Sequence, residues 1–345
     1  MANRHPGELP ELTLLKALIE RDVDGLTARV LGTVSADGRA FPVHEIALGT
    51  DDPTAPCVLY VGGVHGVERI GSQVVLAFLG HLIERLSWDR GLRAELDRVR
   101  LVFVPLVNPA GMWRRSRCNA EGVDLMRNAP VIADGRVPWP AGGQRLSAHL
   151  PWYRGRAEDP MAAEARMLCD LVRSELSGRA FALSLDCHSG FGMRDRLWFP
   201  YAYSVRPFEE AGAVHALSRL FEAAYPNHVH YLFEPQSRQY TTHGDLWDYL
   251  YLGLRESTGG YLPLTLEMGS WVWVKKNPLQ IRRLSGLFNP VRRHRLQRTL
   301  RRHLVMMEFL MRAAADYDRW YPRPEVAGEL QRAAFDRWYR ATCDA

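Results

Sequence analysis

Two side chains that can bind a metal ion follow the first strongly apolar segment of the chain. Residues 57–61 form a short apolar run that ends in Gly62-Gly63, a pattern typical of a buried strand. His65 and Glu68 come directly after it, at the point where ligand sites lie in open α/β sheets. An imidazole and a carboxylate three residues apart in one turn can reach the same cation, although helix capping or chance also produces such a pair.

Two more polar residues follow apolar strands later in the chain. His188 comes after the predicted strand at residues 181–185, and Glu267 comes after the predicted strand at 262–266. A catalytic zinc site needs three protein ligands and an open position for water, so His188 is a candidate third ligand. A buried glutamate is costly unless it is paired or takes part in chemistry. Beside a metal-bound water, Glu267 would act as general base and then as general acid toward the leaving nitrogen.

A segment rich in arginine lies between these strands. Arginines beside a metal centre can stabilise a developing oxyanion or hold a carboxylate with a bidentate fork. Any one of them can instead be a solvated surface charge. The segment comprises Asn-Pro-Ala-Gly at residues 108–111, then Arg114, Arg115 and Arg117, then Gly-Val-Asp-Leu-Met-Arg-Asn at residues 122–128.

The composition bounds the class of protein. The chain has 345 residues, of which 47% are hydrophobic, which is enough for a large α/β core. Its five cysteines are an odd number and form no Cys-x-x-Cys pair, which argues against a disulfide framework and fits a reducing compartment. The first residues are polar, and no run of ~18 apolar residues exists, so we expect no secretory signal and no membrane span. A cytoplasmic protein is predicted.

The net charge of +5 comes mostly from arginine. The densest basic cluster, at residues 292–302, alternates with apolar residues at helical spacing, which favours an amphipathic helix with a solvated basic face. A docking surface for an anionic partner is the alternative. No nucleic-acid module accompanies the cluster, so nucleic acid is not an expected partner.

Alternating strand and helix patterns predict an α/β fold: a mixed, mainly parallel central sheet with helices on both faces. We expect a single domain over residues 1–345, with a core at about 28–285 and a helical C-terminal extension at 286–345 packed on it. The proline-rich loop at 129–160 is either a functional lid or surface padding. Strands are expected within 28–49 and at 57–61, 101–107, 181–185 and 262–266, and helices at 74–86, 162–176, 213–224 and 291–315.

The ordered set of motifs resembles the zinc carboxypeptidases, the carboxypeptidase A-like family. The resemblance runs from about residue 28 to residue 270, and each motif is weak alone while their order is rather specific. It implies a zinc carboxypeptidase-like (phosphorylase/hydrolase-like) fold and a metallopeptidase that cleaves C-terminal peptide bonds.

The resemblance also implies roles for individual residues around one zinc ion (Zn²⁺) per chain. His65, Glu68 and His188 are similar to the family's zinc ligands. Glu267 is similar to the glutamate that activates the zinc-bound water. Asp124 is similar to an aspartate that orients the first zinc histidine.

Substrate contacts are implied in the same way. Arg117 is similar to the arginine that polarises the scissile carbonyl, and Arg127 to the one that binds the substrate's terminal carboxylate, with Asn128 beside it. Tyr240 is similar to the mobile tyrosine that closes over substrate. Trp247 would then lie at the specificity pocket.

One departure from the family pattern affects the expected substrate. Met126 stands where the family usually has asparagine, just before the arginine that binds the terminal carboxylate. Three functions stay open. The first is a carboxypeptidase acting on short peptides. The second, which Met126 favours, is an N-acyl amino acid deacylase or amidase of the aspartoacylase/succinylglutamate desuccinylase type, and the third is a non-catalytic binding protein that docks through the basic cluster at 292–302. The oligomeric state is not fixed by these patterns.

Overall fold

One mixed sheet forms the centre of the molecule. The computed structural model describes residues 8–340, and within them eight strands pair in the order β1-β2-β4-β3-β5-β8-β6-β7. The pairs β3–β4, β3–β5, β5–β8 and β6–β7 are parallel, and the remaining three are antiparallel. The strands are β1 (Thr27–Ala36), β2 (Arg39–Gly49), β3 (Cys57–Gly62), β4 (Arg100–Val104), β5 (Ala182–Ser189), β6 (Asp195–Phe199), β7 (Tyr231–Pro235) and β8 (Tyr261–Met268).

The three strands that precede the candidate residues are neighbours. β3, β5 and β8 are parallel and buried along their whole length, which is why they appear in the sequence as continuous apolar runs. Gly62 pairs with Cys187, and His188 pairs with Glu267. This register brings the carboxyl ends of the three strands to one edge of the sheet.

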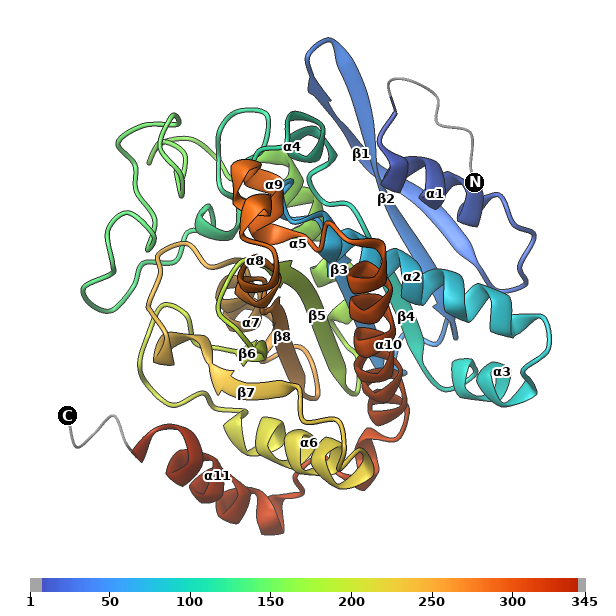
Figure 1. Cartoon of the computed structure of the whole chain (residues 1–345). Helices are drawn as coiled ribbons and strands as arrows, with labels where there is room; N and C mark the ends of the chain where they lie inside the picture. The colour runs from blue at the N-terminus through green and yellow to red at the C-terminus, as the bar shows by residue number, and fades with distance from the viewer. Residues whose placement is uncertain (1–7, 341–345) are drawn as a thin grey trace.

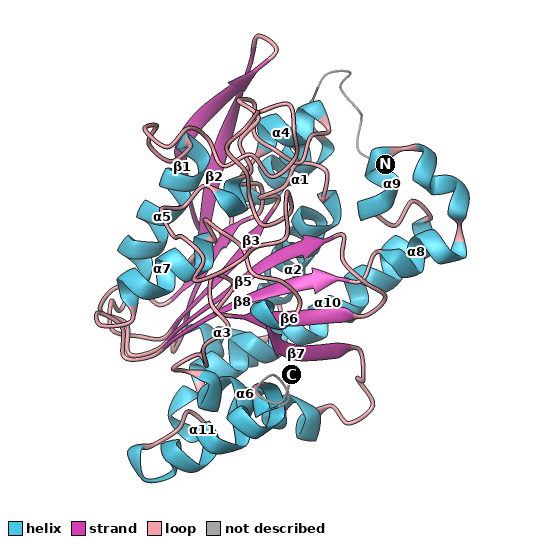
Figure 2. Cartoon of the chain, turned by 90° about the vertical axis from the view of Figure 1, so that its left-hand side faces the viewer, coloured by secondary structure: helices cyan, strands magenta, loops and turns pink. Residues whose placement is uncertain are grey.

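Helices cover both faces of the sheet, as predicted (Figure 1). On one side lie α1 (Pro10–Ile19), α2 (Arg69–Leu86) and α10 (Arg293–Ala315), and on the other α5 (Ala163–Leu176) and α7 (Leu246–Leu254). Figure 2 shows the sheet between these two layers. The hydroxyl of Tyr60 on β3 donates to the carbonyl of Met307 on α10, 2.7 Å away, and fixes that helix to the sheet. The predicted α/β fold with a mixed sheet is therefore confirmed.

The remaining helices lie at the ends of the sheet or outside it. α11 packs on α6, away from the central strands, and α9 lies near the carboxyl ends of β3, β5 and β8. No helix within residues 8–340 is long and apolar enough to span a bilayer. These helices are α3 (Arg90–Leu96), α4 (Pro109–Arg114), α6 (Ala211–Ala224), α8 (Trp271–Lys276), α9 (Leu284–Phe288) and α11 (Pro324–Trp338), with 3-10 turns at Leu125–Arg127, Gln236–Arg238, Pro278–Arg282 and Tyr317–Arg319.

Candidate active site

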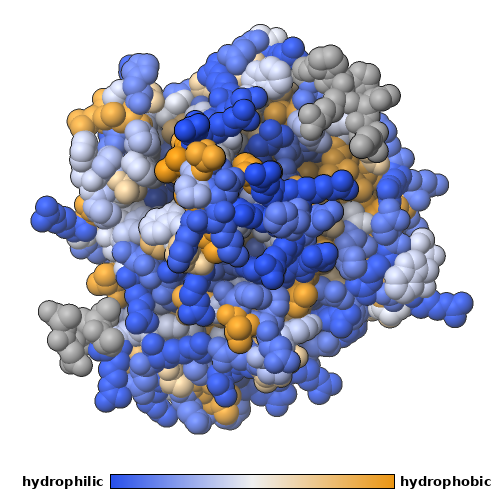
Figure 3. Space-filling view, viewed as in Figure 1, coloured by the Kyte–Doolittle hydropathy of each residue, from blue (hydrophilic) through white to orange (hydrophobic). Residues whose placement is uncertain are grey.

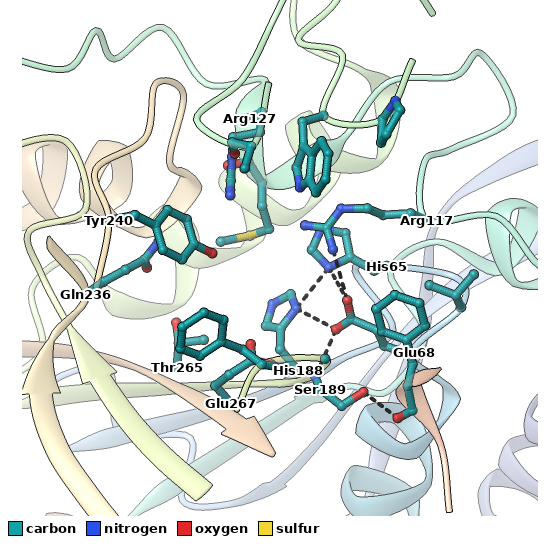
Figure 4. A pocket seen from close by; sticks show the side chains of 18 of the residues that line it. His65, Glu68, Arg117, Arg127, His188, Ser189, Gln236, Tyr240, Thr265 and Glu267 are labelled. Atoms are coloured by element: carbon teal, nitrogen blue, oxygen red, sulfur yellow. Dashed lines mark hydrogen bonds and ion pairs between the residues drawn. The ribbon is translucent and has the colours of Figure 1, made fainter. Parts of the chain in front are cut away.

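His65, Glu68 and His188 converge on one point at the end of the sheet (Figure 4). Nδ1 of His65 lies 2.9 Å from Oε1 of Glu68, and Nδ1 of His188 lies 3.1 Å from Oε2 of Glu68 and 3.1 Å from Nδ1 of His65. All three side chains are buried. One ligand atom from each lies within 4.8 Å of the others, so the three can share a single metal ion.

The outer nitrogen of each histidine faces a buried carboxylate. Nε2 of His65 lies 3.1 Å from Oδ1 of Asp124, and Nε2 of His188 lies 2.6 Å from Oδ2 of Asp186. A carboxylate accepts a hydrogen bond, so each Nε2 carries a proton, and each Nδ1 is the atom that would present its lone pair to a metal ion at the common point. Two imidazole lone pairs and a carboxylate are a donor set that suits zinc, and this geometry fits the implied ion.

Close backbone packing holds the loop that carries two of these residues. A Cβ on Gly66 would lie only 2.1 Å from the backbone of Gly111, so only glycine lets the turn after β3 approach α4. α4 itself is capped by Asn108, whose side chain accepts from the Gly111 amide and donates to the carbonyl of Val64. The Asn-Pro-Ala-Gly motif therefore positions the turn that carries His65 and Glu68.

Electrostatics favour the charged forms of these buried groups. Burial alone would raise the pKa of Glu68, but His65 and His188 hold it far below its usual range. Burial would likewise lower the pKa of His188, but Asp186 and Glu68 raise it well above its ordinary value. The cluster therefore keeps a carboxylate ionised in an almost dry environment.

Glu267 faces the same point from β8. Its Oε1 accepts a hydrogen bond from the Phe191 amide, 3.0 Å away. Burial, together with the negative charge of Glu68, raises the pKa of Glu267 to about 8, while His188 and Arg117 oppose that rise. A carboxyl group with its pKa near neutrality suits general acid–base catalysis, and a cation held by the three ligands would favour its ionised form.

Arg117 bridges two carboxylates beside the metal-binding group. Its Nε donates to Oδ2 of Asp124 over 2.8 Å, and its Nη1 donates to Oε1 of Glu68 over 3.2 Å. Although burial disfavours the charge, Asp124 and Glu68 raise the pKa of Arg117 above its ordinary value. Its side chain is still 22% exposed, so the guanidinium can also be reached from the cavity.

Arg127 and Tyr240 lie on the opposite wall, with the Tyr240 hydroxyl pointing into the cavity (Figure 4). Nε of Arg127 donates to the carbonyl of Ala141, and its Nη1 donates to the carbonyl of Met126. These bonds hold the guanidinium in place before any ligand arrives. Met126 lines the cavity beside it. Burial raises the pKa of Tyr240, opposed by Arg127 and Arg117, so its phenol stays protonated.

The cavity that these residues share has a volume of about 680 Å³. The proline-rich loop contributes Pro138, Ala141, Pro151 and Trp152 to its wall, so this loop forms part of the site. The cavity is also lined by residues to which the sequence analysis gave no role, among them Phe191, Trp198, Gln236 and Thr265, and Leu284 and Phe288 of α9.

Two predicted substrate contacts are placed elsewhere by the structure. Trp247 does not line the cavity; it lies behind it in the first turn of α7, where its Nε1 donates to Oδ2 of Asp186 over 2.8 Å. Asn128 is also absent from the cavity wall, because its amide is used by the backbone: Nδ2 donates to the carbonyl of Arg154, and Oδ1 accepts from the Ala162 amide. Both residues support the architecture of the site instead.

Asp186 is the residue of this site that the sequence reasoning missed. The sequence does indicate this role. Side chains two residues apart on a strand point to the same face, and Asp186 precedes His188 by two residues. A carboxylate at that spacing from a candidate ligand is therefore a predictor of an outer partner for the imidazole. The pairing of Trp247 with it joins residues 61 positions apart and has no such local signal.

The site thus combines a candidate His-Glu-His metal-binding group, a buried glutamate and two arginines at the carboxyl ends of parallel strands, a set of residues that suits zinc-assisted hydrolysis. The chain belongs to the zinc carboxypeptidase family, whose pattern matches residues 14–269. Carboxypeptidase SOL1 of Arabidopsis thaliana is 24% identical over 271 residues, which cover 72% of this chain and 48% of that protein. The rat carboxypeptidase N catalytic chain is 35% identical over 114 residues, covering 28% of this chain and 25% of that protein.

Solved structures with a similar fold accompany these sequence matches. Thrombin activatable fibrinolysis inhibitor superposes with a TM-score of 0.66 at 19% identity, over 88% of this chain and 73% of that chain. Carboxypeptidase A from Helicoverpa armigera gives a TM-score of 0.61 at 18% identity, over 88% and 71%. At such identities the likeness shows the fold alone. The chain spans about half or less of the length of the curated relatives named above.

Proposed function

We propose that this chain is a zinc-dependent carboxypeptidase that removes the C-terminal residue of a peptide. The observation that carries the proposal is the placement of Glu267 and Arg117 on two sides of the point shared by His65, Glu68 and His188. We further propose one zinc ion per chain, a single catalytic domain that includes the C-terminal helices, and a cytoplasmic location.

Bound zinc would supply Lewis-acid polarisation of the scissile carbonyl and lower the pKa of the attacking water. Glu267 is positioned to take a proton from that water and then to donate it to the leaving nitrogen. The Phe191 amide holds the carboxylate in place for both transfers. Arg117 can stabilise the negative charge that develops on the carbonyl oxygen, because its guanidinium is fixed by Asp124 and Glu68.

Arg127 and Tyr240, on the cavity wall opposite the candidate metal ligands, would orient the substrate. Arg127 presents a pre-positioned guanidinium to a terminal carboxylate, which a bidentate fork binds well. The Tyr240 hydroxyl lies on the same wall and can donate to the same carboxylate or to the scissile amide (Figure 4). Together they would select peptides with a free C-terminus.

A deacylase or amidase acting on an N-acyl amino acid is the second candidate. Met126 supports it, because a thioether in the cavity wall beside Arg127 cannot add a hydrogen bond to a carboxylate. Arg127 and Tyr240 in the same wall support the peptidase instead. A purely non-catalytic binding role does not explain why a buried carboxyl group, two arginines and three candidate metal ligands are brought together in one cavity.

Mass spectrometry of a mixed peptide pool, incubated with zinc-loaded protein, tests the proposal. Each peptide is supplied with a free and an amidated C-terminus, with and without chelator. Chelator-sensitive loss of single residues from free ends alone is the expected result. Absence of cleavage by protein that holds stoichiometric zinc would reject the carboxypeptidase, and N-acyl amino acids would then be tested in the same assay.

A further inference from the structure

A long segment at the C-terminal side of Glu267 carries no negative side chain. Residues 268–307 contain ten Lys and Arg residues and no Asp or Glu. The whole chain has 44 basic and 39 acidic residues, so the rest of the chain holds 34 basic and 39 acidic ones and is net negative. The positive charge of this protein is therefore concentrated in one segment. Figure 3 shows a strongly hydrophilic band over α10, which belongs to that segment.

This basic segment forms part of the mouth of the active-site cavity. Leu284 and Phe288 of α9 line the cavity. Oγ of Ser189, next to a metal-binding histidine, donates to the carbonyl of Phe288 over 2.8 Å. The side chain of Asn289 donates to the carbonyl of Val67 and accepts from the Ile70 amide, over 2.7 Å and 2.9 Å. α9 is thus attached directly to the turns that carry the candidate ligands.

A second groove lies beside the cavity, along this segment. Its volume is about 840 Å³, and it lies between α1, the turn after β3 and the start of α10. Val67 lines both the cavity and the groove, so the two spaces lie next to each other with this residue between them. A peptide with its C-terminal residue in the cavity would have to pass only this short distance to place its preceding residues in the groove.

The uncompensated charges of the groove are positive. Its two acidic residues are already paired, Glu11 with Arg69 over 2.9 Å and Glu8 with Lys16 over 3.6 Å. Arg115 and Arg283 line the groove, are exposed and have no ion-pair partner within residues 8–340. Three more exposed arginines of the basic segment have no ion-pair partner in the described part of the chain: Arg282, Arg292 and Arg293.

We propose that this groove binds the residues that precede the cleaved bond, and that it selects substrates with acidic side chains at those positions. The inference rests on the proposed carboxypeptidase function. Exposed arginines that lack partners attract carboxylates, raise the rate of encounter and lose this effect as salt increases. A peptide is favoured over a nucleic acid because the groove adjoins the candidate catalytic cavity and its apolar wall is aliphatic, at Leu14, Val291 and Leu296.

Three peptides that share their last two residues test this proposal. They differ only at the third to fifth positions from the C-terminus, which carry Glu, Gln or Lys. Values of kcat/KM are measured at about 0.02 M and about 0.5 M salt. At low salt we expect kcat/KM for the Glu peptide to be about tenfold higher than for the Gln peptide, and kcat/KM for the Lys peptide to be the lowest. At high salt we expect the three values to become similar. The double variant Arg115→Gln/Arg283→Gln should bring the Glu-to-Gln ratio close to one.

A matched control removes two exposed arginines that lie elsewhere and also lack an ion-pair partner within residues 8–340. This control, Arg90→Gln/Arg332→Gln, should keep the Glu-to-Gln ratio of kcat/KM unchanged.

Peptide affinity is measured separately by fluorescence anisotropy with zinc-loaded Glu267→Gln protein, so docking is tested even without turnover. Equal affinities for the Glu and Gln peptides overturn the inference, as does an unchanged ratio in the double variant. Tighter binding of an RNA of equal charge would overturn the choice of a peptide. Loss of turnover on every peptide, with charge-selective binding retained, would count against the carboxypeptidase alone.

Discussion

Nε2 of His188 lies 2.6 Å from Oδ2 of Asp186, on the side of the ring that faces away from Glu68. The same carboxylate oxygen accepts from the indole of Trp247 over 2.8 Å, and Asp186 is fully buried. The indole thus fixes the carboxylate, and the carboxylate fixes the tautomer and orientation of the imidazole. Such outer partners contribute substantially to metal affinity.

Replacement of these partners should weaken zinc binding. We expect Asp186→Asn to reduce zinc affinity about 10–100-fold, measured by competition with a chromogenic chelator. Trp247→Phe, which keeps an aromatic ring but loses the N–H, should reduce it less. Trp338→Phe is the matched control, because that equally buried indole donates to the carbonyl of Phe233, away from the site. Unchanged affinity in both site variants would show that the chain Trp247–Asp186–His188 does not act on the metal.

Substitution of Glu267 should separate metal binding from hydrolysis. Glu267→Gln keeps the shape of the side chain and removes the proton-accepting carboxylate. We expect kcat to fall about 10²–10⁴-fold with zinc content unchanged, as measured by peptide turnover and by atomic emission. Glu164→Gln is a control, because burial also raises the pKa of this glutamate, which bonds Asn119 outside the cavity. Turnover retained in Glu267→Gln would remove the general-base role.

The pair Met126 and Arg127 should determine how well a free C-terminus is recognised. Arg127→Lys keeps the charge but loses the fork, so we expect KM for free-end peptides to rise about tenfold or more, which corresponds to the ~1.5–3 kcal/mol of a charged hydrogen bond. Met126→Asn adds an amide and should lower KM. Amidated peptides serve as the comparison. If both substitutions changed turnover of free and amidated peptides equally, Arg127 would not read the terminal carboxylate.

A buried histidine that does not line the active-site cavity should make stability depend on pH. Burial lowers the pKa of His303 to about 4, with Arg302 acting in the same direction and Asp195 opposing it. The unfolded chain, with a histidine pKa near 6.5, binds this proton at a higher pH than the folded chain does. Above about pH 6.5 this histidine therefore does not change the free energy of unfolding. As the pH falls from 6.5 toward 4, the free energy of unfolding decreases by up to about 3 kcal/mol.

Unfolding by urea between pH 7 and pH 4 measures this loss. His303→Asn keeps a polar atom toward the Tyr231 hydroxyl, which lies 2.8 Å from Nδ1 of His303, and cannot titrate. We expect the variant to have a flatter pH dependence, even if it is less stable at pH 7. A variant whose stability falls as steeply as that of the natural protein would assign the effect to other groups, such as His228 or His230.

The sequence by itself determined the fold class and the residues that reach the end of the sheet. The apolar runs before His65, His188 and Glu267 are buried strands, and polar residues at the ends of parallel strands meet at one edge. The family order of motifs added the arginines and Tyr240. These predictions depend on local patterns and on spacing along one strand or turn, which the sequence contains directly.

Tertiary structure decided which partners these side chains have. Trp247 lies behind the cavity because α7 packs against the sheet with its first turn toward Asp186. The side chain of Asn128 does not face the cavity because it forms hydrogen bonds with the backbone of Arg154 and Ala162. The position of α9 at the cavity mouth likewise follows from contacts with Ser189 and Val67, about 100 and 220 residues earlier in the chain. Such contacts arise from how whole elements pack together, and the order of residues within one element does not specify them.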